Sequence, residues 1–142
     1  MDVLFIASVA IVAPDPAESR KLFMDVLGLP LKRHGGDDYY FSENIGGSKH
    51  FGVWPLSQAA EACFGTTVWP ADRPVPHACF EFEVADKDSV AAAAEELKSK
   101  GYVLLHGART EPWGQIVARV QTAEGAIIGI SYAPWMHEAK QG

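Results

Sequence analysis

Cysteine is scarce in this chain, and positive charge is in the minority. The only cysteines among its 142 residues, Cys63 and Cys79, match neither a metal-binding spacing nor a disulfide framework, so we expect a reduced, cytoplasmic protein. Lysine and arginine number 12 against 18 acidic residues, and the formal net charge is −6. Nucleic-acid binding needs a basic face, so this balance argues against a nucleic-acid partner. It is compatible with a cationic ligand, although solubility alone explains it.

Membrane-spanning runs and nucleotide motifs are missing as well. The apolar N-terminal stretch 3–13 is too short to cross a bilayer, and Asp2 stands where a signal peptide carries basic residues. We therefore expect a buried strand there and no membrane partner. The sequence has no phosphate-binding loop, no dinucleotide fingerprint and no serine–histidine–aspartate order. The Gly-Gly pairs at 35–36 and 46–47 are interpreted as hairpin turns.

The chain does contain one pattern written twice. An apolar run leads into a helix-like stretch that stops at Gly28, and the alternating segment 80–86 leads into a second that stops at Gly101. Strand-like segments follow each helix, and the last one carries a glycine in an apolar run, Gly52 or Gly129. This repeat predicts a single domain of two βαβββ modules, of the α+β class. Module one covers about 1–55, a connector about 56–75 and module two about 76–134.

Local signals place the helices of both modules. Asp15 is expected to cap the first helix, and Asp86 or Asp88 the second. The apolar stripe of the first helix is expected to comprise Leu22, Phe23, Val26 and Leu27. A short helix is expected at 57–63 within the connector. The tail 134–142 is expected to be ordered only in part, through Trp135 and Met136.

Three passages carry a resemblance to a known family. They are AESRKLFMDVLGLPL at 17–31, VPHACFEFEVADKDS at 75–89 and TEPWGQIVARVQTAEGAIIGISY at 110–132. Together they resemble the vicinal oxygen chelate superfamily, the group of glyoxalase I, bleomycin-resistance proteins and extradiol dioxygenases. The resemblance covers almost the whole chain. It implies that the two βαβββ modules form a cup-shaped, partly closed sheet, that a small-molecule ligand binds in the cup, and that the protein is a homodimer.

Catalytic members of this superfamily are expected to hold a divalent metal in the cup, with ligands from the first and last strands of each module. We place Ser8, Gly52, His77 and Gly129 at those positions, so one donor of four remains. His77 and Glu81 lie about 13 Å apart on one strand at roughly 3.3 Å per residue, too far to share an ion. We therefore expect no metal cofactor. A divalent metal held through His77 and further ligands is the alternative.

The resemblance also predicts which residues face the cup. The ligand-binding candidates are Ser8, Gly52, Trp54, His77, Cys79, Glu81, Trp113, Arg119, Gly129 and Ser131. Aromatic walls with a few polar groups are typical of small-molecule pockets. His77 is either a hydrogen-bonded pocket residue or a general base. Cys79 is either a buried structural thiol or a nucleophile, and Trp54 belongs either to the core or to the pocket.

Arg119 has two interpretations. It either anchors a carboxylate or phosphate through its planar fork, or it pairs with Glu81 or Glu83.

The remaining histidines are not predicted to have a role in the site by themselves. His50 shares a strand face with Gly52 and is the side chain that would approach His77 from module one. Three others are interpreted as surface residues: His34, His106 and His137.

These observations predict a protein that binds a small organic molecule in the cup between its modules, without a catalytic metal. The bleomycin-resistance type, which sequesters a toxic compound without chemistry, is the nearest analogy. One alternative is a metal-dependent glyoxalase- or dioxygenase-type enzyme that uses His77. The other is a metal-free isomerase or lyase in which His77 acts as the base and Arg119 holds an enolate. The sequence does not identify the ligand.

Overall fold

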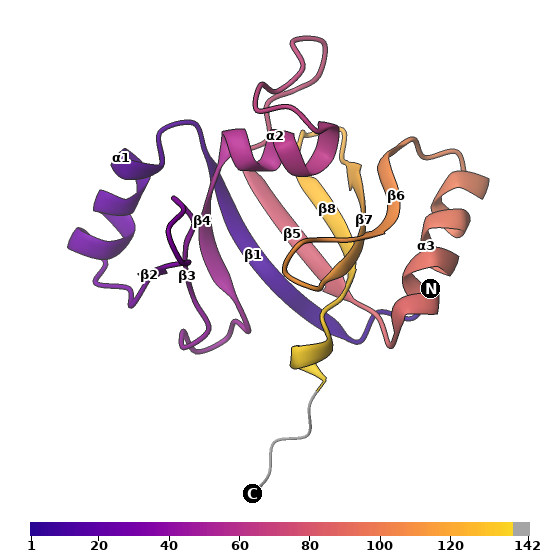
Figure 1. The fold of residues 1–142 in the computed structure, drawn as a ribbon, viewed down its shortest axis with the longest axis horizontal. Helices are drawn as coiled ribbons and strands as arrows, with labels where there is room; N and C mark the ends of the chain where they lie inside the picture. Colours follow the sequence, from indigo (N-terminus) through magenta and orange to yellow (C-terminus); the bar gives the residue numbers. More distant parts are fainter. Residues whose placement is uncertain (138–142) are drawn as a thin grey trace, which may run out of the picture.

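Eight strands form one sheet in a computed structural model that describes residues 1–137 (Figure 1). The strand order across the sheet is β2-β3-β4-β1-β5-β8-β7-β6. The strands are β1 (Phe5–Ala13), β2 (Lys32–Arg33), β3 (Tyr40–Ser42), β4 (Phe51–Pro55), β5 (Ala78–Glu83), β6 (Leu104–Thr110), β7 (Ile116–Gln121) and β8 (Ile127–Tyr132). The helices are α1 (Pro16–Arg20), which continues as a π-helical stretch (Lys21–Val26), α2 (Leu56–Phe64), α3 (Lys87–Ser99) and a 3-10 turn (Pro134–Met136).

The sheet consists of two halves with the same internal order. At its centre β1 pairs antiparallel with β5, and each of these strands pairs in parallel with the last strand of its own module, β4 or β8. β1 to β4 with α1 form one half, β5 to β8 with α3 form the other, and α2 connects them (Figure 1). This arrangement confirms the predicted α+β fold of two βαβββ modules, with a curved sheet that does not close.

The helix starts follow the capping signals of the sequence. The Asp15 carboxylate accepts a hydrogen bond from the Glu18 amide at 3.2 Å, and the Asp86 carboxylate accepts one from the Ser89 amide at 2.8 Å. Each bond satisfies an amide that has no partner inside its own helix. Gly28 ends the first helical segment with a φ of +68°, a left-handed conformation that glycine adopts without steric cost.

The apolar stripe predicted for the first helix is largely wrong. Leu22, Val26 and Leu27 are 52%, 74% and 56% exposed, whereas Phe23 and Met24 pack against the core. The reason is the π-helical stretch, in which the Leu27 amide bonds to the Leu22 carbonyl five residues back. This wider turn rotates the side chains away from the α-helical register on which the prediction was based.

Three apolar clusters hold the sheet and place the helices on it. α3 packs on module two through Val90, Ala93 and Ala94, and α2 closes one end of the sheet through Ala59 and Ala60. α1 and α3 lie at the two sides of the sheet, and α2 lies at one end of it (Figure 1). Within residues 1–137 no helix combines the length and apolar character needed to cross a bilayer. The last part of the predicted tail, 138–142, lies outside the described residues.

Candidate functional site

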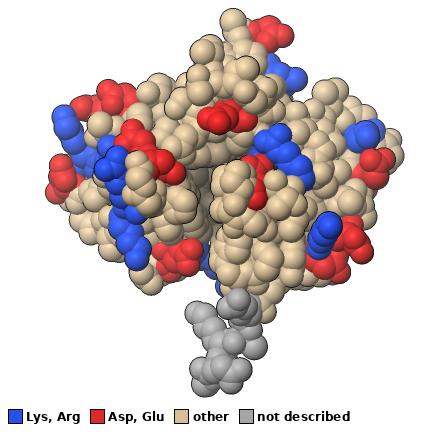
Figure 2. All heavy atoms as spheres, viewed as in Figure 1, with Lys and Arg blue, Asp and Glu red and all other residues tan. Residues whose placement is uncertain are grey.

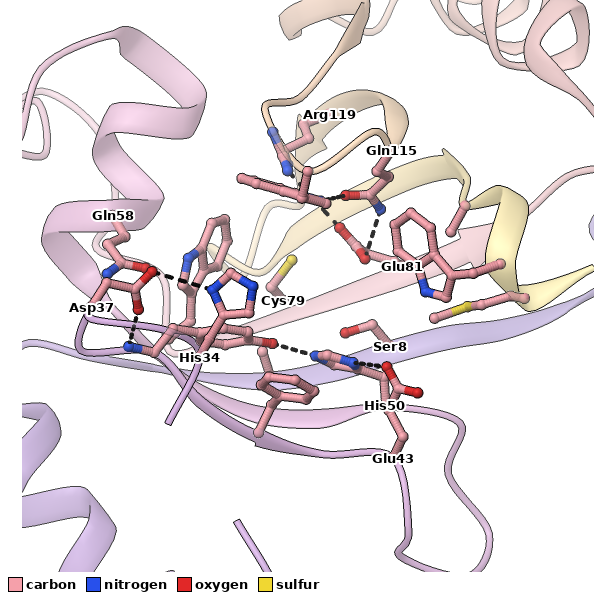
Figure 3. Close-up of a pocket in the computed structure, with 18 residues that line it drawn as sticks. Ser8, His34, Asp37, Glu43, His50, Gln58, Cys79, Glu81, Gln115 and Arg119 are labelled. Atoms are coloured by element: carbon pink, nitrogen blue, oxygen red, sulfur yellow. Dashed lines mark hydrogen bonds and ion pairs between the residues drawn. The ribbon is translucent and has the colours of Figure 1, made fainter. Parts of the chain in front are cut away.

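A cavity of about 350 Å³ lies on the concave side of the sheet. It opens in the recess between the two halves of the molecule (Figure 2), and Figure 3 shows its lining. Both modules, α2 and the chain after β8 contribute to it. The lining residues are Ser8, Ala10, His34, Asp37, Tyr39, Phe41, Glu43, His50, Trp54, Gln58, Cys79, Glu81, Trp113, Gln115, Arg119, Ala133, Trp135 and Met136.

Six of the ten predicted ligand-binding residues line this cavity. They are Ser8, Trp54, Cys79, Glu81, Trp113 and Arg119. The other four do not reach it. His77 is exposed and precedes the first residue of β5. Gly52 and Gly129 are covered by neighbouring side chains, and Ser131 is fully buried behind Gln115, whose side-chain amide donates to the Ser131 hydroxyl at 2.8 Å.

The strand pairing defines which positions of the two modules are equivalent. Ala10 lies beside Gly52 in the parallel pair β1–β4, and Glu81 lies beside Gly129 in the parallel pair β5–β8. Gly52 and Gly129 were predicted to be equivalent, and on that basis Ala10 corresponds to Glu81. The offset is 71 residues between Ala10 and Glu81 and 77 residues between Gly52 and Gly129, because module two has six more residues between its first and last strands.

This equivalence corrects the predicted position of His77. Two residues before Ala10 and Glu81, on the same face of the central strand pair, lie Ser8 and Cys79, and both line the cavity. The counterpart of Ser8 in module two is therefore Cys79, and His77 lies one step further out, where the strand has not yet begun. The sequence placed the module-two donor two residues too early.

Tyr39, His50 and Glu43 form a hydrogen-bonded group on the module-one side of the cavity (Figure 3). The Tyr39 hydroxyl and His50 Nε2 share a short hydrogen bond, and His50 Nδ1 lies 3.7 Å from a Glu43 carboxylate oxygen. The ring of Phe41 stacks on the imidazole at 4.8 Å with an interplanar angle of 11°. This stacking and the two polar contacts fix the orientation of the imidazole.

The electrostatics of this group keep both rings uncharged near neutral pH. Burial raises the pKa of the Tyr39 phenol well above its usual value, and the negative charge of Glu81 adds to the effect. Burial lowers the pKa of His50 below 6.5, although Glu81 and Glu43 oppose that shift. The arrangement therefore fits an imidazole whose Nδ1–H points to Glu43 and whose Nε2 accepts the phenolic hydrogen.

The module-two side of the cavity is organised by Gln115 (Figure 3). Its side-chain amide donates to the Glu81 carboxylate at 3.0 Å, and its carbonyl oxygen accepts from the Trp113 indole at 2.9 Å. The indole at the mouth of the cavity is thus linked to the carboxylate on β5 through one buried amide. Nothing in the sequence marked Gln115 as a member of the site.

Arg119 is occupied by protein partners. Its Nη1 donates to Glu111 at 3.2 Å and contacts His106 Nε2 at 3.0 Å, while its Nη2 lies 3.9 Å from Glu81. Burial alone would lower the pKa of Arg119, but the neighbouring carboxylates outweigh it and the pKa is raised. The pairing interpretation is therefore supported, with Glu111 as the main partner. Glu83, the other predicted partner, instead accepts from His137 at 2.7 Å.

His106 and the cysteines have pKa values that disfavour their charged forms. Burial and the nearby Arg119 lower the pKa of His106 to about 4, so its Nδ1–H donates to the Gly107 carbonyl at 2.7 Å and its Nε2 accepts from Arg119. Burial raises the pKa of Cys63 to about 11 and that of Cys79 well above its usual value. A thiol of this kind is a poor nucleophile, which supports the structural interpretation of Cys79.

Sequence reasoning missed most of the module-one wall. His34 was interpreted as a surface residue, yet it lines the cavity and contacts Asp37 at 3.4 Å. Tyr39, Phe41 and Glu43 were not singled out, although they alternate along the segment around β3 and so share one face. That alternation was the available signal, and it lies outside the passages that carried the family resemblance.

The described residues do not fit a catalytic divalent metal. No three histidine, cysteine, aspartate or glutamate side chains within 1–137 lie close enough together to hold an ion. The four equivalent positions carry Ser8, Gly52, Cys79 and Gly129, and among these only the buried Cys79 offers a strong ligand. A catalytic zinc site, by comparison, has three protein ligands and an open position.

The chain belongs to the glyoxalase/bleomycin resistance protein/dioxygenase superfamily, whose sequence model matches residues 5–130. A search of curated proteins found no match. Among solved structures, a superfamily member from Vibrio splendidus 12B01 is 17% identical and matches 90% of this chain and 97% of its own, with a TM-score of 0.56.

Two further structures show the range of this fold. Methylmalonyl-CoA epimerase from Mycobacterium tuberculosis is 18% identical, matches 94% of this chain and 91% of its own, and has a TM-score of 0.60. An Mn(II)-bound glyoxalase from Novosphingobium aromaticivorans is 18% identical, with 91% of this chain and 38% of its own matched and a TM-score of 0.58. At such identities the likeness shows the fold, and the function has to be argued from the site.

Proposed function

We propose that this protein binds a small, planar organic molecule in the cup between its modules, without a catalytic metal. The observation that carries this proposal is the composition of the cavity wall, in which aromatic rings surround a few fixed polar groups. The rings come from both modules and from the chain after β8: Tyr39, Phe41, Trp54, Trp113 and Trp135. A volume of about 350 Å³ is at the lower end of the range for small-molecule sites.

The charges of the lining favour a neutral or cationic ligand over an anionic one. Three carboxylates line the cavity, those of Asp37, Glu43 and Glu81, against the single guanidinium of Arg119. That guanidinium is paired with Glu111 and faces Glu81, so its charge is compensated within the protein. An anionic ligand would therefore meet uncompensated negative charge in a partly desolvated site. This argues against acyl-CoA substrates and against Arg119 as an enolate clamp.

The mouth of the cavity favours a flat, apolar ligand face. Trp113 and Trp135 both line the cavity while remaining 47% and 41% exposed. Large apolar side chains exposed at a concave site commonly mark a binding surface. Indole rings provide contact area with few rotatable bonds, so they lose little entropy when a ligand covers them.

A homodimer is part of this proposal. The exposed apolar side chains of Val3, Leu4 and Ile6 at the start of the chain support it, since they offer a surface to a second copy. Both walls of the cavity come from one chain, so we expect ligand affinity to be independent of protein concentration. Light scattering across a dilution series, with ligand titrations at each concentration, tests both statements.

The test of ligand binding uses three naphthalene probes that differ in charge: 2-naphthamide, 2-naphthamidine and 2-naphthoate. Quenching of tryptophan fluorescence reports binding, and thermal stabilisation of the folded state supports it. We expect the amide and the amidine to bind, the carboxylate to bind at least about tenfold more weakly, and EDTA to change nothing. Trp54→Leu should weaken binding, whereas Tyr102→Ala, at an exposed aromatic side chain outside the cavity, should not.

The outcome that would overturn the metal-free proposal is a stoichiometric divalent ion in protein purified without a chelator. Equal affinity for all three naphthalene probes would overturn the charge argument. If none of the three binds, the aromatic cup is not a site for planar molecules of this size.

A further inference from the structure

Tyr39 occupies the place that a side chain at position 52 would fill. A Cβ built on Gly52 would lie 2.5 Å from the Tyr39 oxygen, 2.7 Å from Cε1 and 2.8 Å from Cζ. The phenol ring therefore lies against the backbone of β4 at Gly52, and Tyr39 lines the cavity. The superfamily resemblance implies a metal ligand at position 52, on the last strand of module one. In this chain the space beside Gly52 is filled by the Tyr39 hydroxyl, which is hydrogen-bonded to His50.

We propose that Tyr39, His50 and Glu43 form a metal-independent general base that removes a proton from an uncharged planar aromatic molecule bound in the cup. The inference rests on the binding function proposed above and adds an activity to it. Tyr39 contacts the substrate, His50 receives the proton of the phenol, and Glu43 orients the imidazole and compensates its charge. The order carboxylate, imidazole, hydroxyl is the one in which a weakly acidic hydroxyl is activated by a neighbouring base.

The contacts around the imidazole suit this role. His50 Nε2 is bonded to the Tyr39 hydroxyl, and Nδ1 faces Glu43 at 3.7 Å. Glu81, across the cavity, stabilises a positive charge on His50, and His34 opposes it. Phe41 stacks on one face of the imidazole, and Nε2 faces the Tyr39 hydroxyl, so the phenol connects His50 to the cavity that both residues line.

The protonation states are those that a general base requires. Burial lowers the pKa of His50 below 6.5, so the imidazole is uncharged and accepts a proton at neutral pH. Tyr39 stays protonated because its pKa is raised by burial and by Glu81. No tyrosinate accumulates, because the phenolic proton moves to His50 Nε2 as the substrate proton moves to the phenol oxygen.

The proton transfer is balanced without an oxidant, a reductant or a metal. The C–H bond of the substrate breaks, its proton bonds to the Tyr39 oxygen, and the original phenolic proton bonds to His50 Nε2. In an elimination, the electron pair left on carbon forms a new π bond while a leaving group departs, and His50 then releases its extra proton to solvent. In an isomerisation, another atom of the substrate takes a proton from the Tyr39 hydroxyl, which is replaced by the proton held on His50. The substrate class is a neutral arene with an acidic C–H, because the acidic lining disfavours anions.

The experiment uses 5-nitrobenzisoxazole, a flat, neutral arene that reacts by loss of one C–H proton. Removal of that proton forms a nitrile, breaks the ring N–O bond and releases a coloured phenolate, so no co-reactant is needed. We expect turnover in the presence of EDTA. His50→Gln and Tyr39→Phe should each lower kcat/KM by about 100-fold or more, and the double variant should lose little further. His77→Gln, at an exposed histidine outside the cavity, is the matched control and should leave the rate unchanged.

Two measurements keep the outcomes distinct. The pH–rate profile should fall on the acid side with a limb below pH 6.5 that disappears in His50→Gln, which a purely structural role for His50 would not produce. Tryptophan quenching measures binding of the same probe. Binding without His50-dependent turnover overturns the general base and leaves the binding function intact. Absence of binding overturns both, and turnover that EDTA abolishes overturns the metal-independent mechanism.

Discussion

Gly52→Ala is the substitution that most directly tests the geometry of the cup. The new methyl group would lie 2.5–2.8 Å from three atoms of the Tyr39 ring and hydroxyl, closer than non-bonded atoms approach. The clash involves a stiff ring that stacks on Phe41 at 5.5 Å and hydrogen-bonds to His50, so it cannot be relieved by rotating a flexible chain end. The ring has to leave its position or β4 has to shift.

Three contributions determine how much Gly52→Ala lowers the free energy of unfolding. Overpacking of this kind costs about 1–3 kcal/mol. Loss of the Tyr39–His50 hydrogen bond adds about 0.5–1.5 kcal/mol. Replacing glycine by alanine within a strand returns about 0.5–1 kcal/mol. We therefore expect a net loss of about 0.5–4 kcal/mol in the free energy of unfolding, measured by urea denaturation.

A matched substitution and a rescue complete this test. Gly36→Ala meets no atom within 4 Å and needs no left-handed backbone, so it should be neutral or slightly stabilising. In a Tyr39→Ala background, Gly52→Ala should lower the free energy of unfolding much less, because the ring with which the new methyl group clashes is absent. The double-mutant cycle should therefore give a coupling energy of at least about 1 kcal/mol. Equal stability of the Gly52→Ala and Gly36→Ala variants, or strict additivity in the cycle, would refute the placement of Tyr39 over Gly52.

Three further predictions concern the module-two side and the core. Arg119→Met should lower the free energy of unfolding in urea by about 3–5 kcal/mol, because it removes the buried cation that pairs with the buried Glu111. Arg109 also contacts Glu111, at 3.0 Å, but its side chain is 40% exposed, so Arg109→Met should cost less than about 1 kcal/mol. Burial lowers the pKa of His106 to about 4, so the unfolded chain binds a proton at higher pH than the folded chain does. The contribution of the uncharged His106 to stability should therefore be complete above pH 6.5 and should decrease as the pH falls towards 4. In unfolding curves measured across this range, His106→Gln should make the free energy of unfolding less dependent on pH. Cys63, whose pKa burial raises to about 11, should react with a thiol reagent in native buffer only at the rate at which the protein opens, and fast labelling would contradict its burial.

Much of the fold was predictable because its signals are local. Asp15 and Asp86 cap helices as their side chains indicated, and Gly28 ends one in a left-handed conformation. The repeat of two modules follows from the same local signals appearing twice. The π-helical stretch after α1 was not predictable from the apolar spacing, because it depends on which side chains pack against the sheet. Phe23 and Met24 pack there, whereas Leu22 is exposed.

The site was predictable in part, and the failures have a common cause. Residues on the central strands, such as Ser8 and Glu81, were placed correctly because alternation along one strand decides which way they point. The error at His77 and the omission of Tyr39 both concern relations between strands. Whether Cys79 or His77 is the counterpart of Ser8 depends on the register of β5 against β1, and that register is set by tertiary pairing.

Gly52 and Gly129 occupy the positions where metal donors were expected, and polar side chains of neighbouring residues cover both. Each lacks a side chain on the concave face, and each is covered by a neighbour, Gly52 by Tyr39 and Gly129 by Glu81, whose Cγ would lie 3.2 Å from a Cβ there. A donor side chain at position 52 would collide with Tyr39, and one at position 129 would require Glu81 and Val117 to shift by a few tenths of an ångström. A metal donor at position 52 would therefore require displacement of Tyr39 and loss of its hydrogen bond to His50. Packing therefore disfavours a metal donor at both positions, and the proposed base relies instead on the phenol, the imidazole and the carboxylate of module one.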